Sequence, residues 1–175
     1  MENNIIIDKD LPLLICDADE VIFNFMDSFD EFLNINNMYF SYETFKLNGN
    51  ILQKKNNMPI NSNEVPKIIS TFFEHYTMKM PFINNAKEVL KELSYRINII
   101  ILSNIPKASS MNRINYLKQN DMHYKFICNE GPKNIKCIEL EKLTNKNVFF
   151  MDDLPSQIAS VNNSCKNIIT IHFLQ

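Results

Sequence analysis

The chain has 175 residues, a formal net charge of −2 and 45% hydrophobic residues. This length fits one domain with a small insertion, and the composition supplies a buried core, so a disordered chain is excluded. The 18 basic and 20 acidic residues form no basic stripe that would indicate a nucleic-acid polymer as partner. We expect a cytoplasmic protein without a membrane partner. The longest aliphatic run, Ile99 to Leu102, is too short to cross a bilayer, and the first residues lack the basic region of a signal peptide.

The first predicted strand, residues 13–16, is followed by two carboxylates two positions apart, Asp17 and Asp19. Side chains alternate along a strand, so both carboxylates are expected to face one pocket at the strand's carboxyl end, where open α/β sheets bind ligands. Like charges this close persist with a cation or a basic partner. The pair therefore indicates a metal and nucleophile-plus-acid/base chemistry, and the alternative is a pair that only caps the next turn.

Residues 24–80 carry two helical patterns of apolar residues, separated by a polar segment at 48–63. We predict a small α-helical cap here, which would cover the Asp17 and Asp19 pocket and exclude water from it. The alternative is a pair of ordinary packing helices. The aromatic residues of this segment are predicted to form the core of the cap and not a stacking platform for substrate; they are Phe29, Phe32, Phe40, Phe45, Phe72 and Phe73.

The rest of the chain alternates apolar strand patterns with amphipathic helices. The further strands are predicted at residues 97–102, 126–128, 148–151 and 168–173. This alternation predicts an α/β fold, a three-layer Rossmann-like domain around a parallel sheet. The predicted division is a core of residues 1–23 and 81–175 with the cap at 24–80. Dinucleotide-binding and P-loop folds are excluded, because the chain has two glycines and no Gly-rich loop.

Polar residues also follow the later strands. Ser103 and Asn104 end the second strand, Asp152 and Asp153 end the fourth, and Lys133 precedes a helix between them. Each has an ordinary explanation as a helix cap, a turn or a solvated lysine. All fall at the same edge of the predicted sheet as the first acidic pair. Together they predict a divalent-cation site beside an anion-binding site, and Lys136 competes with Lys133 for the basic position.

The order and spacing of these motifs resemble the haloacid dehalogenase (HAD) superfamily of phosphohydrolases over nearly the whole chain. The segment Asp17-Ala18-Asp19-Glu20-Val21 is similar to the family's first motif, Asp-x-Asp-Gly-Thr/Val. The second, third and fourth motifs are similar at Ser103, Lys133 and Asp152-Asp153. The predicted cap lies between motifs one and two, as in many members. Glu20 departs from the pattern, because the family usually has Gly there, and the turn after Asp19 is expected to differ.

The resemblance implies the role of each site residue. Asp17 would be the nucleophile that forms an aspartyl-phosphate, and Asp19 would be the general acid and base. Phosphate would be bound by Ser103, Asn104 and Lys133. Magnesium would be held by Asp17, Asp19 (through its backbone carbonyl), Asp152 and Asp153, with Asp153 favoured over Asp152 as the direct ligand.

The expected function is thus Mg²⁺-dependent hydrolysis of a phosphomonoester. The substrate would be a small phosphorylated metabolite, with a nucleoside monophosphate as one candidate. The alternative is a catalytically weak HAD-fold module that binds a phosphate ligand or has a regulatory role, because Glu20 adds negative charge at the pocket rim.

Overall fold

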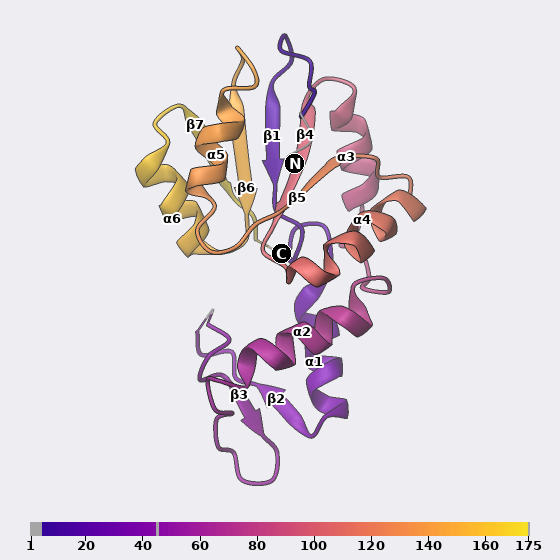
Figure 1. Ribbon diagram of the computed structural model, residues 1–175, viewed down its shortest axis with the longest axis vertical. Coiled ribbons are helices and arrows are strands. Elements are labelled where there is room, and N and C mark those ends of the chain that lie inside the picture. The colour runs from indigo at the N-terminus through magenta and orange to yellow at the C-terminus, as the bar shows by residue number, and fades with distance from the viewer. Residues whose placement is uncertain (1–4, 45, 175) are drawn as a thin grey trace.

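Five parallel strands form the central sheet, in the order β5-β4-β1-β6-β7 (Figure 1). The structure is a computed structural model that describes residues 5–44 and 46–174. The strands are β1 (Leu13–Cys16), β4 (Asn98–Ser103), β5 (Lys125–Cys128), β6 (Val148–Asp152) and β7 (Ile168–His172). Each matches a predicted strand to within one residue at either end, so the α/β fold with a parallel sheet is confirmed.

Helices cover both faces of the sheet, which gives the three predicted layers (Figure 1). Leu13 and Ile15 of β1 pack on the face covered by α5 (Asn134–Glu141) and α6 (Pro155–Ser164). Leu14 and Cys16 pack on the opposite face, which α3 (Ala86–Ser94) and α4 (Ser110–Gln119) cover. Burial on both faces explains why the central strands β1 and β4 are continuous apolar runs and do not alternate with polar residues. Among the described residues, no helix has the length and apolar character needed to cross a membrane.

The position of β1 determines where the site lies. β1 pairs with β4 on one side and with β6 on the other, so the strand order changes direction at β1. In open α/β sheets, ligands bind at such a switch point, in the crevice beyond the carboxyl ends of the strands. The residues that follow β1, β4 and β6 therefore meet at one place.

The segment between β1 and α3 lies beyond this carboxyl edge (Figure 1). It contains α1 (Phe25–Ile35), β2 (Met38–Phe40), β3 (Ile51–Gln53) and α2 (Val65–Tyr76). The prediction of an all-helical cap was incomplete, because β2 and β3 form an antiparallel two-stranded sheet. Three-residue strands are too short to show a period in the sequence, and their pairing joins residues that the chain separates. The boundary of the cap at residues 24–80 stays a prediction.

Aromatic side chains form the core of the cap, as predicted. Phe29 and Phe72 are fully buried, with ring centroids 5.1 Å apart, and Phe25 contacts Phe72 at 5.2 Å. Phe32, Phe40 and Phe73 are also buried. Phe45 lies outside the described residues. Edge-on and stacked rings of this kind give a small element enough apolar contact to order its helices.

Candidate active site

A buried lysine joins two of the predicted carboxylates. Lys133 Nζ lies 2.5 Å from Asp17 Oδ1 and 2.6 Å from Asp152 Oδ2, and all three side chains are at most 8% exposed. The Asp17 N–H donates to the Met151 carbonyl at 2.9 Å, which fixes the residue after β1 against β6. Burial by itself would lower the pKa of Lys133, but the two carboxylates outweigh it and raise that pKa. The lysine is therefore a permanent cation at the base of the site.

The structure also separates the two candidate lysines. The Lys133 N–H, at the start of α5, donates to Gln157 Oε1 of α6 at 3.0 Å. Lys136 lies one turn further along α5, and its Nζ is 2.5 Å from Glu139 Oε2. Lys133 therefore contacts two of the acidic residues of the site, Asp17 and Asp152. Gln157 was not anticipated from the sequence, where a glutamine in a helix gives no signal of a contact with another helix.

Three carboxylates form a candidate metal centre. Asp17, Asp152 and Asp153 each offer an oxygen, and these oxygens lie within 4.8 Å of one another. Burial and the Asp17 charge raise the pKa of Asp152. Burial, with the charges of Asp17 and Asp152, raises the pKa of Asp153 to about 8. This excess of negative charge, presented by hard oxygen donors, fits Mg²⁺.

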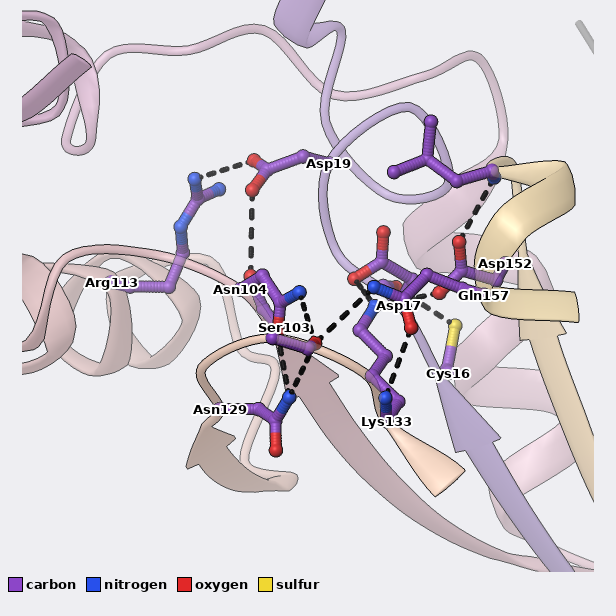
Figure 2. A network of polar contacts seen from close by, with 12 residues as sticks. Cys16, Asp17, Asp19, Ser103, Asn104, Arg113, Asn129, Lys133, Asp152 and Gln157 are labelled. Carbon is purple, nitrogen blue, oxygen red and sulfur yellow. Dashed lines mark hydrogen bonds and ion pairs between the residues drawn. The ribbon is translucent and has the colours of Figure 1, made fainter. Parts of the chain in front are cut away.

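Asp19 faces a different part of the site (Figure 2). Its Oδ1 accepts from Arg113 Nη2 at 2.7 Å, and its Oδ2 lies 3.4 Å from the Ser103 hydroxyl. The Asp19 carboxylate is therefore not among the three grouped acidic oxygens, and a metal contact through its backbone carbonyl stays a prediction. β1 ends at Cys16, so strand alternation no longer governs Asp19, although both Asp17 and Asp19 line the same pocket.

Arg113 is a site residue that the sequence did not reveal. It lies on α4, its side chain is fully buried, and its Cζ is 4.1 Å from the centroid of the Phe23 ring. Among the described residues, Arg113 Nε and Nη1 have no hydrogen-bond partner. An arginine in an amphipathic helix usually faces solvent, so no sequence pattern singles out Arg113. Its stacking on an aromatic ring offsets part of the cost of burying it.

The environment of Asp19 is consistent with an acid/base residue. Burial raises the pKa of Asp19, the Arg113 charge opposes that shift, and the Asp17 charge adds to it. A carboxyl group with a raised pKa binds a proton closer to neutral pH, which a general acid requires.

Two loops of the site are bonded to each other. Asn104 Nδ2 donates to the Gly131 carbonyl at 2.8 Å, and Asn129 Nδ2 donates to Asn104 Oδ1 at 2.8 Å. The Asn129 N–H also donates to the Ser103 carbonyl at 2.8 Å. Ser103 is fully buried, whereas Asn104 lines the pocket. The loops after β4 and β5 are thus held together, and Asn129 is a supporting residue that the sequence did not indicate.

Glu20 adopts the backbone conformation that glycine favours. Its φ is +60°, in the left-handed region, which glycine adopts at little cost. The expected difference in the turn after Asp19 stays a prediction. The Glu20 carboxylate accepts from the Met26 N–H at 2.6 Å, in the first turn of α1. Burial raises the pKa of Glu20, and this hydrogen bond opposes the shift. Glu20 therefore caps the first helix of the cap from the loop after β1.

Glu20→Ala is expected to lower the free energy of unfolding by about 1 kcal/mol, because a cap of α1 is lost. Glu20→Gly is expected to lower it less, since glycine relieves a left-handed strain of roughly 1 kcal/mol. Chemical denaturation of the two variants measures the difference. A Glu20→Ala variant that is more stable than Glu20→Gly would contradict this account of Glu20.

A pocket of about 500 Å³ connects these residues to the cap. Asp17, Lys133 and Asp153 line its polar end. Phe40 and Phe73 of the cap line it as well, so these two rings belong both to the cap core and to the pocket wall. Predicted site residues from three strand ends therefore share one cavity with the cap.

No protein-family model matches the sequence, and no curated protein matches it. Solved structures do resemble it. A predicted phosphoglycolate phosphatase from Haemophilus somnus aligns with a TM-score of 0.62 and 12% identity, over 94% of this chain and 85% of that one. The HAD hydrolase YfnB from Bacillus subtilis, bound to magnesium, aligns with a TM-score of 0.59 and 11% identity, over 94% and 87%.

A haloacid dehalogenase-like family hydrolase from Streptococcus pneumoniae aligns with a TM-score of 0.59 and 8% identity, over 94% of this chain and 84% of that one. These alignments span the core and the cap together. At such low identities, likeness in structure is evidence for the fold. The parallel sheet, the inserted cap and these neighbours together establish that the chain has the fold of the haloacid dehalogenase-like hydrolases.

Proposed function

We propose that the protein is a Mg²⁺-dependent phosphomonoester hydrolase that acts on a small phosphorylated metabolite through an aspartyl-phosphate. The observation that carries the proposal is the bridge of Asp17, Lys133 and Asp152 at the polar end of the pocket. The proposed nucleophile, Asp17, contacts the fixed cation Lys133 and is also one of the three carboxylates of the candidate metal centre, which supports this role. A buried carboxylate with such partners can attack a phosphorus atom that is itself surrounded by negative charge.

The reaction then divides into two displacements. An oxygen of Asp17 forms a bond to phosphorus while the bond from phosphorus to the leaving oxygen breaks, and Asp19 gives that oxygen a proton. Asp19 next takes a proton from water as the water attacks the aspartyl-phosphate, which releases phosphate and restores Asp17. Lys133 stabilises the charge on the phosphoryl oxygens, and Asn104, which lines the pocket, is a further phosphate contact. The Ser103 hydroxyl is buried against Asp19 Oδ2, so its contact with phosphate stays a prediction from the resemblance. Bound Mg²⁺, held by Asp17, Asp152 and Asp153, would offset the charge between carboxylate and phosphate.

Arg113 is assigned as a positioning residue for this reaction. It does not line the pocket, but its ion pair fixes the Asp19 carboxylate at 2.7 Å on the pocket wall. The guanidinium is itself oriented by the Phe23 ring. Arg113 thus acts on the leaving group only through Asp19.

The proposal is tested by Mg²⁺-dependent release of phosphate from a generic aryl phosphate and from a broad panel of phosphomonoesters. Phosphate release that a chelator abolishes is the expected result. A folded chain that releases no phosphate from any member of the panel would overturn the hydrolase assignment.

One observation favours the second candidate, a module that binds a phosphate ligand with little turnover. The Arg113 charge opposes the rise that burial causes in the pKa of Asp19, and so it disfavours the protonated form of Asp19 that would donate to a leaving group. Binding of inorganic phosphate in the presence of Mg²⁺, without hydrolysis of the panel, would identify this function.

The stability of the metal-free protein is expected to fall as pH rises from about 4 to about 8. In the unfolded chain Asp153 ionises near its ordinary pKa of 3.8, but in the folded protein burial and the neighbouring carboxylates raise that pKa to about 8. Between pH 3.8 and about pH 8, Asp153 binds a proton in the folded state more often than in the unfolded state. The stability that this protonation contributes is therefore complete below pH 3.8 and is lost as the pH rises through about 8. Mg²⁺ interacts with the ionised carboxylates, so it is expected to raise Tm more at pH 8 than at pH 5.

Thermal melts at several pH values, with and without Mg²⁺, measure this dependence. Asp153→Asn is expected to reduce both the fall of the metal-free Tm with rising pH and the increase in Tm that Mg²⁺ causes. Asp10→Asn, which changes an exposed carboxylate outside the pocket, is the matched control. A metal-free Tm that increases from pH 5 to pH 8 would contradict the prediction.

A further inference from the structure

The pocket has an apolar side that the proposed chemistry does not use. Its polar end contains the proposed phosphate-binding and metal-binding groups, whereas most side chains on the side formed by the cap are apolar, with Tyr42, Glu43 and Thr44 as the polar ones. The apolar side chains there are Phe25, Met26, Phe40, Leu47, Ile69 and Phe73. A phosphomonoester with its phosphorus at Asp17 would direct its leaving group toward this side. Apolar walls bind apolar groups, because contact removes both surfaces from water.

The charges in the pocket oppose a second anion. Within residues 5–44 and 46–174, Lys133 is the one basic side chain that lines the pocket, and its Nζ already contacts Asp17 and Asp152. The acidic side chains of Glu20 and Glu43 line the pocket as well. A leaving group with its own carboxylate or phosphate would meet like charge, and among the described residues no basic side chain of the cap lines the pocket to offset it.

The size of the pocket also indicates a bulky leaving group. A volume of about 500 Å³ lies within the range typical for drug-sized ligands. A phosphate with a two-carbon leaving group would leave much of the apolar wall without contact. The wall therefore suits a leaving group of the size of one or two rings.

We infer that the substrate is a phosphomonoester of a bulky, largely apolar alcohol that carries no second negative charge. This inference rests on the proposed function and narrows it to a substrate class. Phosphate monoesters of simple aromatic alcohols and of nucleosides have a ring-containing leaving group without a second negative charge. Phosphorylated hydroxy acids and bisphosphates carry that second charge.

A series of primary alkyl phosphates tests the inference while leaving-group basicity stays nearly constant. The series is ethyl, benzyl, 2-naphthylmethyl and 4-carboxybenzyl phosphate, with phosphoglycolate and thymidine 5′-monophosphate. We expect kcat/KM to rise by about tenfold or more from ethyl to benzyl phosphate, and to fall by about tenfold or more when the carboxylate is added. The ratio of thymidine 5′-monophosphate to 2-naphthylmethyl phosphate distinguishes a nucleoside from a simple aromatic alcohol.

A charge reversal on the cap provides a matched comparison. Glu43 is exposed at the pocket wall, so Glu43→Lys is expected to fold normally and to recover most of the lost kcat/KM for 4-carboxybenzyl phosphate. Glu43→Gln is expected to recover less. Glu74→Lys, on α2 outside the pocket, changes the net charge equally and is expected to recover none of it.

Binding of non-hydrolysable phosphonates separates this inference from the proposed function. Calorimetry in the presence of Mg²⁺ is expected to show benzylphosphonate binding about tenfold more tightly than phosphonoacetate. That preference without any hydrolysis would support the ligand class and contradict the hydrolase assignment. Equal or reversed affinities, or phosphoglycolate as the better substrate, would overturn the inference even if hydrolysis is observed.

Discussion

Asp17→Asn is expected to reduce kcat for phosphomonoester hydrolysis by about 10⁴-fold or more, because a carboxamide does not form the aspartyl-phosphate. Asn has nearly the size of Asp, and its amide oxygen can still accept a hydrogen bond from Lys133, whose Nζ lies 2.5 Å from Asp17 Oδ1. The fold and the pocket should therefore persist while turnover is lost. The measurements are kcat and, by mass spectrometry after acid quenching, the amount of phosphorylated protein.

Two controls make this result specific. Asp10→Asn removes an exposed carboxylate elsewhere and is expected to leave kcat unchanged. Thermal melts show whether the Asp17 variant remains folded. Turnover at the wild-type rate in a folded Asp17→Asn variant would mean that another residue, or water itself, attacks the phosphorus.

Arg113→Met is expected to have the second large effect, on stability and turnover together. Removing one partner of a buried ion pair leaves the other uncompensated, which costs about 3 kcal/mol of unfolding free energy. Arg113 is fully buried and Asp19 is 18% exposed, so solvent can replace only part of the lost contact. Because Asp19 loses its orientation, kcat should fall by roughly 10- to 100-fold while KM changes little.

A double-mutant cycle distinguishes positioning from a purely structural role. Adding Asp19→Asn to Arg113→Met should restore part of the stability, because no unpaired carboxylate remains, but it should not restore turnover. Arg113→Lys keeps the charge and should recover part of kcat. Arg96→Met, at the chain's exposed arginine, is the matched control and should change stability by less than about 0.5 kcal/mol. If Arg113→Met lowers stability but leaves kcat unchanged, Arg113 does not position Asp19.

The strands of the sheet could be predicted because their signal is local. A strand buried on both faces, such as Ile99 to Leu102, needs a continuous apolar run, and the sequence shows that run directly. The short β2 and β3 could not be predicted in this way. Their pairing joins Phe40 to Ile51, and the packing of the aromatic cap stabilises strands that carry little signal of their own.

In the candidate site, too, some features could be predicted from the sequence and others could not. Asp17, Lys133 and Asp152 each stand at the end or start of a regular element, so their meeting followed from the topology of a parallel sheet. The direction of the Asp19 side chain did not follow, because β1 ends before it and the loop decides its rotamer. Glu20 appeared to break a motif, yet its φ of +60° and its bond to Met26 show a side chain accommodated in the conformation that glycine favours.

The sequence alone therefore determined the five strands of the central sheet, their order along the chain, and the acidic residues and lysine that gather at its carboxyl edge. These properties depend on neighbours along the chain and on the fixed geometry of parallel strands. The tertiary structure decided that Arg113 is buried against Asp19, 94 positions away, and that the cap presents an apolar wall to the pocket. Contacts between residues so distant in the chain depend on burial and charge in the folded protein, and the local sequence pattern does not indicate them.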